Sequence, residues 1–161
     1  MSRDDDGPLH GRVGDGATQH PPGTLHAFVR CVGSPPEYAT QGASGADLRS
    51  AERVTLFDGE RRVIRTGLRI ALAPGTEGQV RPRSGMTKRG IDVPLGTIDR
   101  DYRGEIGVCM VNRSGKPFDV EPGDRIAQLV IAPVLHATFA VVEKIDDTAR
   151  GDGGFGSTGH R

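Results

Sequence analysis

The stretch "EIGVCMVNRSGKPFDVEPGDRIAQLVIAPV" (residues 105–134) alternates short apolar runs with turn-forming residues. The turn signals "RSGK" and "EPGD" separate the apolar runs 105–112 and 124–134. Runs of this length, rich in valine and isoleucine and bounded by glycine and proline, are typical of β-strands. The stretch therefore predicts short strands joined by tight turns.

The same pattern continues on both sides of this stretch. Strands are predicted over residues 25–32, 61–72, 77–83, 105–112, 124–134 and 138–145. Only "SGMTKRG" (84–90) predicts a short helix, with Ser84 as its N-cap. Many short strands at near-regular spacing predict an all-β sandwich or barrel. Aromatic residues are scarce, so the core of one chain is thin and association of several chains is expected to support it.

The composition divides the 161 residues into one domain with two unusual ends. Residues 1–24 are rich in glycine, proline and charge and carry no apolar segment of a signal peptide, which predicts a disordered leader. The β domain is expected over 25–147. Residues 148–161 include "RGDGGFGSTG", in which Phe155 is the only large apolar side chain, and they predict a flexible arm.

Charge and cysteine content exclude several classes of protein. The formal net charge is zero, which argues against stable binding to nucleic acid or to a membrane surface. No apolar run reaches membrane-spanning length, and the five histidines show no metal-ligand spacing. Cys31 and Cys109 lie within apolar stretches and are predicted to be buried, unreactive thiols. A cytoplasmic location fits this cysteine usage.

Three polar motifs each allow a functional and a structural interpretation. In "GQVRPRSGM" (78–86), strand alternation places Gln79, Arg81 and Arg83 on one face, and Pro82 predicts an edge strand. Guanidinium groups beside the free amides of a helix start suit a phosphate chain. Solvated arginines beside a capped helix explain the same residues.

In "LGTIDRDYRGEIG" (95–107), Asp99 follows the apolar Ile98, so its carboxylate is expected at the edge of the core. A carboxylate held there can orient and deprotonate water, and Tyr102 can offer a flat surface to a sugar. From spacing alone, simple turn chemistry is the more economical explanation, above all for Asp101 and Arg103.

Two further polar residues lie next to apolar neighbours. In "GDRIAQLVIAPV" (123–134), alternation places Ile126, Gln128 and Val130 on one face, so Gln128 is expected to be half-buried and to need a hydrogen-bond partner. That partner could belong to the fold, to another subunit or to a ligand. Asp47 in "GASGADLRS" (42–50) reads, taken alone, as a turn residue.

Taken together and in order, five segments resemble the motifs of the homotrimeric dUTPase family, the deoxyuridine 5′-triphosphate nucleotidohydrolases. They are "ASGADLRS", "RPRSGM", "GTIDRDYRGEIG", "GDRIAQLV" and "RGDGGFGSTG", and they span residues 43–159. The resemblance implies a jelly-roll-like distorted β-barrel, a homotrimer with active sites between subunits, and Mg²⁺-dependent cleavage of dUTP into dUMP and pyrophosphate. Such an enzyme limits uracil incorporation into DNA and supplies dUMP for dTTP synthesis.

The resemblance also implies a role for individual residues. Asp99 is the catalytic residue, which activates the attacking water and touches the sugar 3′-hydroxyl, and Tyr102 packs under the deoxyribose. Asp47 holds the magnesium ion through water. The other substrate-binding positions are Arg83, Ser84, Gly85, Val93, Gly96, Thr97, Ile98, Gly107, Gln128, Arg150, Phe155, Gly156, Ser157 and Thr158.

Within this set the implied contacts divide by chemical group. Arg83 to Gly85 and Gln128 meet the phosphates. Backbone groups around Gly96, Thr97 and Gly107 read uracil. Val93 stands where some members carry an asparagine and has no amide to offer the base.

The arm 148–161 is implied to close over the nucleotide as a lid. Phe155 stacks on the uracil ring. Arg150, Ser157 and Thr158 meet the γ-phosphate.

Two alternatives remain open at the level of sequence. A dCTP deaminase shares the fold and needs a general acid or base beside the pyrimidine, for which Glu105 is the candidate. A binding or regulatory protein on the same scaffold would have lost catalysis, and the presence of Asp99, Tyr102 and Phe155 argues against that loss.

Overall fold

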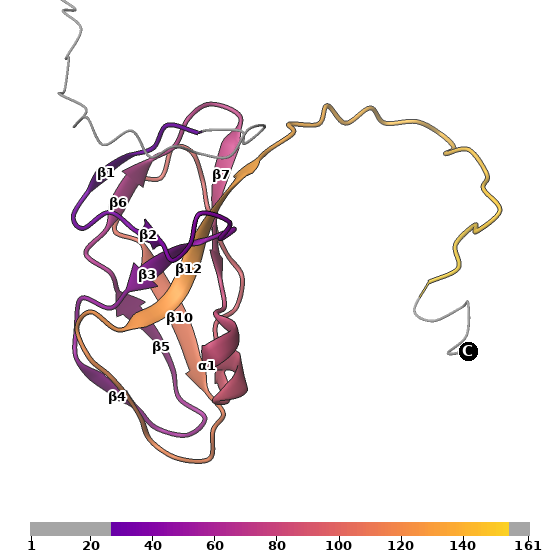
Figure 1. The fold of residues 1–161 in the computed structure, drawn as a ribbon. Helices are drawn as coiled ribbons and strands as arrows, with labels where there is room; N and C mark the ends of the chain where they lie inside the picture. The colour runs from indigo at the N-terminus through magenta and orange to yellow at the C-terminus, as the bar shows by residue number, and fades with distance from the viewer. Residues whose placement is uncertain (1–26, 155–161) are drawn as a thin grey trace, which may run out of the picture.

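The computed structural model describes residues 27–154, and within that range the chain forms twelve short strands and one helix (Figure 1). The strands are Arg30–Val32 (β1), Glu37–Tyr38 (β2), Ala46–Arg49 (β3), Val54–Leu56 (β4), Arg61–Arg65 (β5), Arg69–Ala71 (β6), Thr76–Arg81 (β7), Ile91–Asp92 (β8), Gly96–Ile98 (β9), Gly107–Asn112 (β10), Phe118–Val120 (β11) and Arg125–Pro133 (β12). The helix α1 spans Ser84–Lys88. The predicted all-β fold with one short helix is confirmed.

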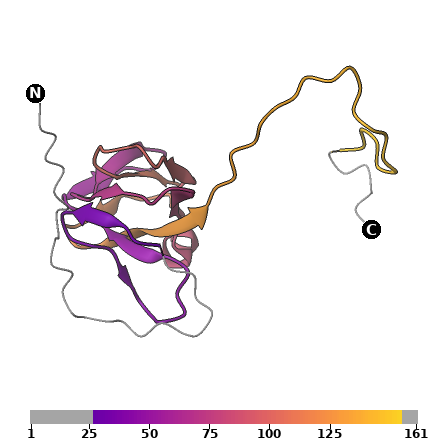
Figure 2. The ribbon, with the colours of Figure 1, turned by 90° about the horizontal axis from the view of Figure 1, so that it is seen from above.

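The strands pair antiparallel in four small sheets. The largest has the order β2-β3-β12-β7-β9, and the others are β5-β10-β8, β1-β6 and β11-β4. Seen from above, these sheets curve around one interior (Figure 2), as in a jelly-roll-like distorted barrel. One apolar cluster fills that interior, and its fully buried members include Leu56, Ile64, Ile91, Val108, Met110, Val120 and Ile126.

A glycine divides the strand that the sequence predicts over residues 61–72. Gly67 has a φ of +67°, a left-handed backbone conformation that residues other than glycine rarely adopt. The chain turns there, so β5 ends at Arg65 and β6 begins at Arg69.

The strand predicted over residues 138–145 does not form. β12 ends at Pro133, and the chain beyond it extends away from the barrel (Figures 1 and 2). Phe139 is 91% exposed and Val141 102% exposed, so these apolar side chains pack on nothing within the described part of the chain. The alternation of this segment is strand-like, but no strand within residues 27–154 lies beside it to accept its backbone hydrogen bonds.

Three local predictions are also wrong. Arg83, rather than Ser84, is the N-cap of α1, and no side chain caps this helix. Pro82 does not mark an edge strand, because β7 ends one residue earlier and lies between β12 and β9. Cys31 is exposed on β1 and Cys109 is only half-buried on β10, because each side chain faces away from the interior.

The ends of the chain are covered only in part. The leader predicted over 1–24 lies outside the described residues, as do residues 155–161 of the predicted arm. Across 27–154, no helix is long and apolar enough to cross a membrane. The domain limits at 25 and 147 therefore stay predictions.

Candidate active site

The first group of predicted site residues lies on the outer face of the five-stranded sheet. Asp47 on β3 pairs directly with Gln128 on β12, which in turn pairs with Arg81 on β7. Residues paired in this way share a face of the sheet. Three strands that are distant in sequence thus place a carboxylate, an amide and a guanidinium in one row.

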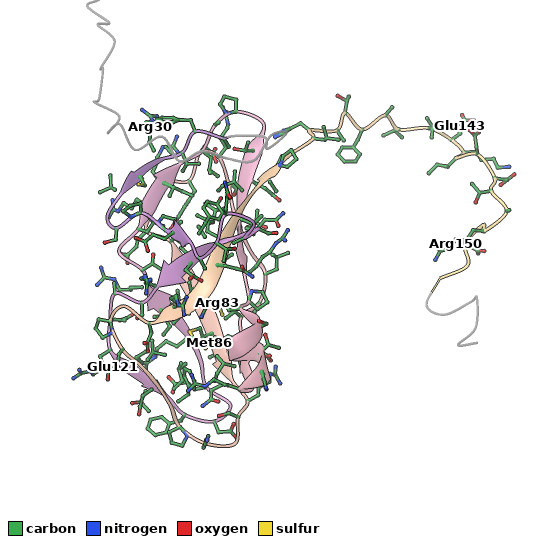
Figure 3. All side chains as sticks on the ribbon, viewed as in Figure 1. Arg30, Arg83, Met86, Glu121, Glu143 and Arg150 are labelled. Carbon is green, nitrogen blue, oxygen red and sulfur yellow. The ribbon has the colours of Figure 1, made fainter. Side chains whose placement is uncertain are left out.

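Asp47 is held by two arginines. Its side chain is only 11% exposed, with Oδ1 lying 2.9 Å from Arg83 Nε and Oδ2 lying 3.2 Å from Arg125 Nη1. Arg83 Nη1 also donates a hydrogen bond of 3.0 Å to the Arg125 carbonyl. The two guanidinium groups compensate the charge of this nearly buried carboxylate. The contacts fix Arg83 next to the start of α1, as Figure 3 shows.

Gln128 ties β12 to the segment that precedes α1. It is half-buried, as predicted, and its Nε2 donates a hydrogen bond of 2.9 Å to the Pro82 carbonyl. A Cβ on Gly45 would lie 2.7 Å from Gln128 Oε1, so glycine is needed there for the amide to fit. Ser84 and Gly85 are exposed beside this group.

The predicted single face of Ile126, Gln128 and Val130 is interrupted. A β-bulge lies between Arg125 and Ala127, and both Ile126 and Ala127 are fully buried. The extra residue of a bulge breaks the alternation of faces along a strand. Gln128 and Val130, which pair with Arg81 and Gln79, keep the predicted relation.

The second group lines a pocket of about 200 Å³. The pocket is formed by Val80, Gly96, Thr97, Ile98, Asp99, Tyr102, Glu105, Ile106 and Gly107. The six predicted substrate or catalytic positions of the segment 96–107 are thereby brought together. Val80 and Ile106 were not predicted to take part, and Glu105 was considered only as the acid or base of a deaminase.

A tight turn places the two key side chains of this pocket. The Tyr102 amide donates to the Asp99 carbonyl at 3.1 Å, which closes the turn after β9. Ile98 is buried and Asp99 is exposed, as predicted, so the carboxylate lies at the rim of the core. Asp99 is therefore accessible to water and to a ligand in the pocket.

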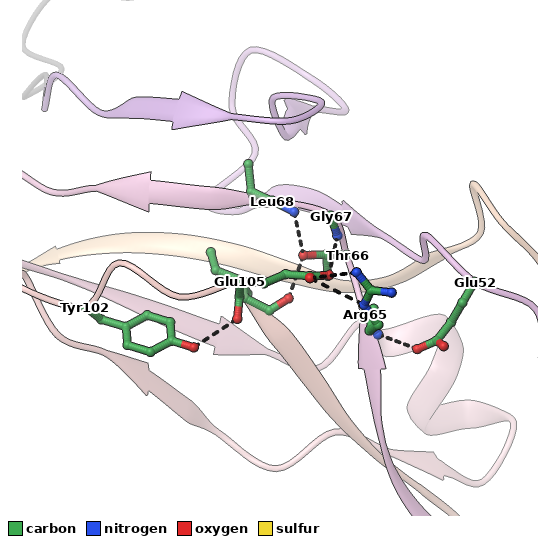
Figure 4. A network of polar contacts seen from close by, with 8 residues as sticks. Glu52, Arg65, Thr66, Gly67, Leu68, Tyr102 and Glu105 are labelled. Atoms are coloured by element: carbon green, nitrogen blue, oxygen red, sulfur yellow. Dashed lines mark hydrogen bonds and ion pairs between the residues drawn. The ribbon is translucent and has the colours of Figure 1, made fainter.

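Glu105 is engaged on both carboxylate oxygens (Figure 4). Oε2 lies 3.1 Å from Arg65 Nη2, and Oε1 accepts a hydrogen bond of 2.8 Å from the Gly67 amide. The hydrogen bond from Arg65 and then that from Gly67 hold the pKa of Glu105 below its usual value. A carboxylate that stays ionised and already accepts two bonds is poorly suited to carry a proton to a substrate.

The two groups lie on different strands of the same sheet. Asp47 and Gln128 share one face of β3 and β12. The pocket takes Val80, Gly96 and Ile98 from the other face, whereas Thr97, which pairs with Gln79, lies on the face of Gln128. One chain therefore presents two separate half-sites, one rich in arginine and one shaped as a pocket.

Comparison with known protein families shows which family this chain matches. The family model described as dUTPase matches residues 33–159. The chain belongs to the dUTPase family. The matched range contains all five motifs, which span residues 43–159.

Individual dUTPases are similar over most of the chain. The deoxyuridine 5′-triphosphate nucleotidohydrolase of Anaeromyxobacter sp. (strain Fw109-5) is 56% identical over 127 residues, which cover 77% of this chain and 86% of the relative. Among solved structures, the Staphylococcus bacteriophage 80alpha dUTPase with dUPNHPP is 27% identical, with a TM-score of 0.77. That match covers 84% of this chain and 99% of the phage protein. A dUTPase variant from phage phi11 of S. aureus, 24% identical with a TM-score of 0.68 over 73% of this chain and 97% of the phage chain, coordinates a structural Mg(II) ion.

Of the remaining predicted site residues, Val93 and Arg150 lie apart from both half-sites. Val93 is almost fully buried in the core and does not line the pocket. Arg150 is exposed on the extended C-terminal segment, where its Nε donates to the Gly153 carbonyl at 2.9 Å. Phe155, Gly156, Ser157 and Thr158 lie outside the described residues.

Proposed function

We propose that this member of the dUTPase family hydrolyses dUTP to dUMP and pyrophosphate by attack of one water on the α-phosphorus. The observation that carries the proposal is the pocket of residues 96–107, which has the Asp99 carboxylate at its rim and the Tyr102 ring in its wall. The names of the relatives support the same substrate.

In this proposal the pocket holds the nucleoside. Backbone groups of Gly96, Thr97 and Gly107 read uracil, and Tyr102 packs under the deoxyribose, which leaves no room for a 2′-hydroxyl. Asp99 is the general base that deprotonates the attacking water. Its exposure beside a closed turn supports this role, since a base must reach both the water and the phosphorus.

The arginine-rich half-site receives the triphosphate. Arg83, Ser84, Gly85 and Gln128 bind phosphate oxygens, and the fixed guanidinium of Arg83 offsets the charge that develops on them. Because Asp47 and the Arg125 carbonyl already hold Arg83, this charge needs no rearrangement when the nucleotide binds.

The residues present fit a magnesium ion that arrives with the nucleotide. In the described part of the chain, no three acidic, histidine or cysteine side chains form a metal cage. Mg²⁺ is commonly bound by one or two carboxylates together with substrate phosphates and water. Asp47, whose oxygens already face two guanidinium groups, would hold it through water, and the ion would supply positive charge to the triphosphate.

A homotrimer with sites between subunits accounts for the two half-sites. The pocket of one chain includes none of Asp47, Arg83 and Gln128, which favours a site in which each half comes from a different chain. The exposed apolar side chains of residues 135–145 also favour burial against another copy. The arm 148–161 then closes as a lid, with Phe155 on uracil and Arg150, Ser157 and Thr158 at the γ-phosphate.

Such an enzyme would limit uracil incorporation into DNA and supply dUMP for dTTP synthesis, in the cytoplasm. Deamination of dCTP is less well supported, because Glu105 is bound to Arg65 and Gly67 and its pKa is lowered. The pocket that holds Asp99 and Tyr102 together argues against a binding or regulatory protein that has lost catalysis.

A nucleotide panel tests the proposal. Purified full-length protein is incubated with Mg²⁺ and dUTP, dTTP, dCTP or UTP, and pyrophosphate and ammonia are measured. The proposal expects pyrophosphate from dUTP far above the other three, and loss of that activity when EDTA removes the metal. Ammonia from dCTP, or no preference for dUTP, would contradict it.

A further inference from the structure

The loop between β5 and β6 is hydrogen-bonded to two residues of the nucleoside pocket, Glu105 and Ile106. Thr66 Oγ1 donates to the Ile106 carbonyl at 2.6 Å, and the Ile106 amide donates to the Leu68 carbonyl at 2.8 Å. The two bonds to Glu105 described above come from Arg65, the last residue of β5, and from Gly67 of the loop. Four contacts therefore connect a loop outside the family motifs to two residues of the pocket.

The loop is itself held in place. The Arg65 amide donates to Glu52 Oε1 at 2.7 Å, and the Leu68 amide donates to Thr66 Oγ1 at 3.2 Å. Figure 4 shows this network running from Glu52 through the loop to Glu105 and on to Tyr102. The β5–β6 loop, which we call the anchor of Glu105, is thus a fixed part of the barrel.

Tyr102 is fixed at two points next to this anchor. Its hydroxyl donates to the Glu105 carbonyl at 3.0 Å. Its ring lies against Gly104 so closely that a Cβ there would stand 2.2 Å from Tyr102 Oη. The position of the ring therefore follows the position of the Glu105 backbone.

We propose that Glu105 is a positioning residue for Tyr102: its carboxylate anchors the segment 102–107 on the β5–β6 loop and thereby sets the discrimination between deoxyribo- and ribonucleotides. This inference rests on the proposed function, in which Tyr102 packs under the sugar. It gives Glu105 a part in specificity that its carboxylate exerts through Tyr102, because both carboxylate oxygens are already bound to Arg65 and Gly67.

Stability alone does not explain this arrangement. The Arg65 side chain is 68% exposed, and exposed ion pairs contribute little to folding. The spacing between Tyr102 and a sugar must be exact to reject one hydroxyl, and a displacement of about 1 Å can cost roughly 10²-fold in rate. Losing the anchor should therefore change selectivity much more than stability.

The chain contains a matched control in Glu60. Its Oε2 accepts a 2.9 Å hydrogen bond from the Phe57 amide, and its Oε1 lies 3.1 Å from Arg62 Nε. Its side chain is 26% exposed, against 23% for Glu105. Glu60 thus has the same chemistry and burial, but it lies in the β4–β5 turn and lines no part of the pocket.

The experiment compares full-length wild type with Glu105→Ala, Glu105→Gln and Glu60→Ala. For each, kcat and KM are measured with dUTP and with UTP, and folding is checked by circular dichroism and thermal unfolding. For Glu105→Ala we expect the ratio of kcat/KM for dUTP over UTP to fall about tenfold. Glu105→Gln, which keeps an acceptor for the Gly67 amide, should lose less, and Glu60→Ala should keep the wild-type ratio.

Two outcomes would overturn the inference: a folded Glu105→Ala with the wild-type ratio, or an equal loss in Glu60→Ala. If Glu105→Ala does not fold, Arg65→Ala removes only one of the two anchors and must still lower the ratio. A wild-type protein without preference for dUTP would refute the proposed function itself, which separates that failure from this one.

Discussion

At the scale of single residues, Asp99 carries the chemistry of the proposal. A general base contributes about 10²–10⁴-fold to rate. Asp99→Asn keeps the shape of the side chain but cannot accept the proton from water, so kcat for dUTP should fall by about that factor while KM changes little. Steady-state pyrophosphate release measures both constants. Wild-type kcat in a correctly folded variant would remove Asp99 from the mechanism.

Glu105 gives a prediction about pH. Arg65 and the Gly67 amide lower its pKa in the folded state from the usual 4.5. A lowered folded-state pKa stabilises the protein above the unfolded value, and this stabilisation is lost as the pH falls through the folded value. Glu105→Gln should therefore be slightly less stable than wild type at neutral pH, and the difference should shrink below about pH 4.5. Chemical unfolding at several pH values measures it, and a difference that is constant with pH would show that the ionised carboxylate contributes nothing.

The sequence predicted site residues from their motifs, but it did not predict the contacts that join distant parts of the chain. Asp47, Asp99 and Tyr102 are recognisable from their neighbours in the chain. Arg125 and Glu105 also stand within motifs. Their partners, Asp47 and Arg65, are 78 and 40 residues away in the sequence. Only the paired strands and the β5–β6 loop bring those partners together, so no local pattern could reveal the contacts.

At the scale of elements, the turn after β9 depends on one small residue. Gly104 leaves the space that the Tyr102 ring occupies. Gly104→Ala should push the ring aside and lower the preference for dUTP over UTP. Gly42→Ala, where an added Cβ meets nothing within 4 Å, is the matched control and should change nothing. If Gly104→Ala had the same kcat and KM as wild type for dUTP and also for UTP, this would contradict the role of the ring.

The C-terminal arm gives a second prediction at this scale. Among the described residues, ending the chain after Thr148 removes no strand and no core residue, so the barrel should keep its thermal unfolding midpoint. Turnover of dUTP should fall roughly tenfold or more, because a lid excludes water and completes the site. Calorimetry and pyrophosphate release test the two parts separately. A truncated protein with full activity would remove the arm from the proposal.

Glycine and proline decided how well the elements could be predicted. The turns around "RSGK" and "EPGD" are where the sequence places them, and β10 and β12 follow closely the predicted runs. The strand 61–72 was divided because the conformation of Gly67 depends on contacts that the sequence does not show. Residues 138–145 have a strand pattern without a strand, since pairing requires a neighbour.

At the scale of the whole molecule, the two half-sites predict a defined assembly. The nucleoside pocket of one chain includes none of the arginine-rich group. Closed rings of identical chains bring different surfaces of neighbouring copies together. For the proposed homotrimer, the mass in solution should be three times the 17.1 kDa of one chain, as light scattering can measure.

The most direct measurement is the activity of trimers that mix Arg83→Ala with Asp99→Asn chains. The two variants are co-expressed with different tags, and mixed trimers are isolated by two affinity steps. If each site takes Arg83 from one chain and Asp99 from the next, every mixed trimer keeps one intact site and about one third of wild-type dUTP turnover. Trimers of two differently tagged Arg83→Ala chains serve as control and stay inactive. Mixed trimers as inactive as that control would show that both halves act within one chain and would contradict the account.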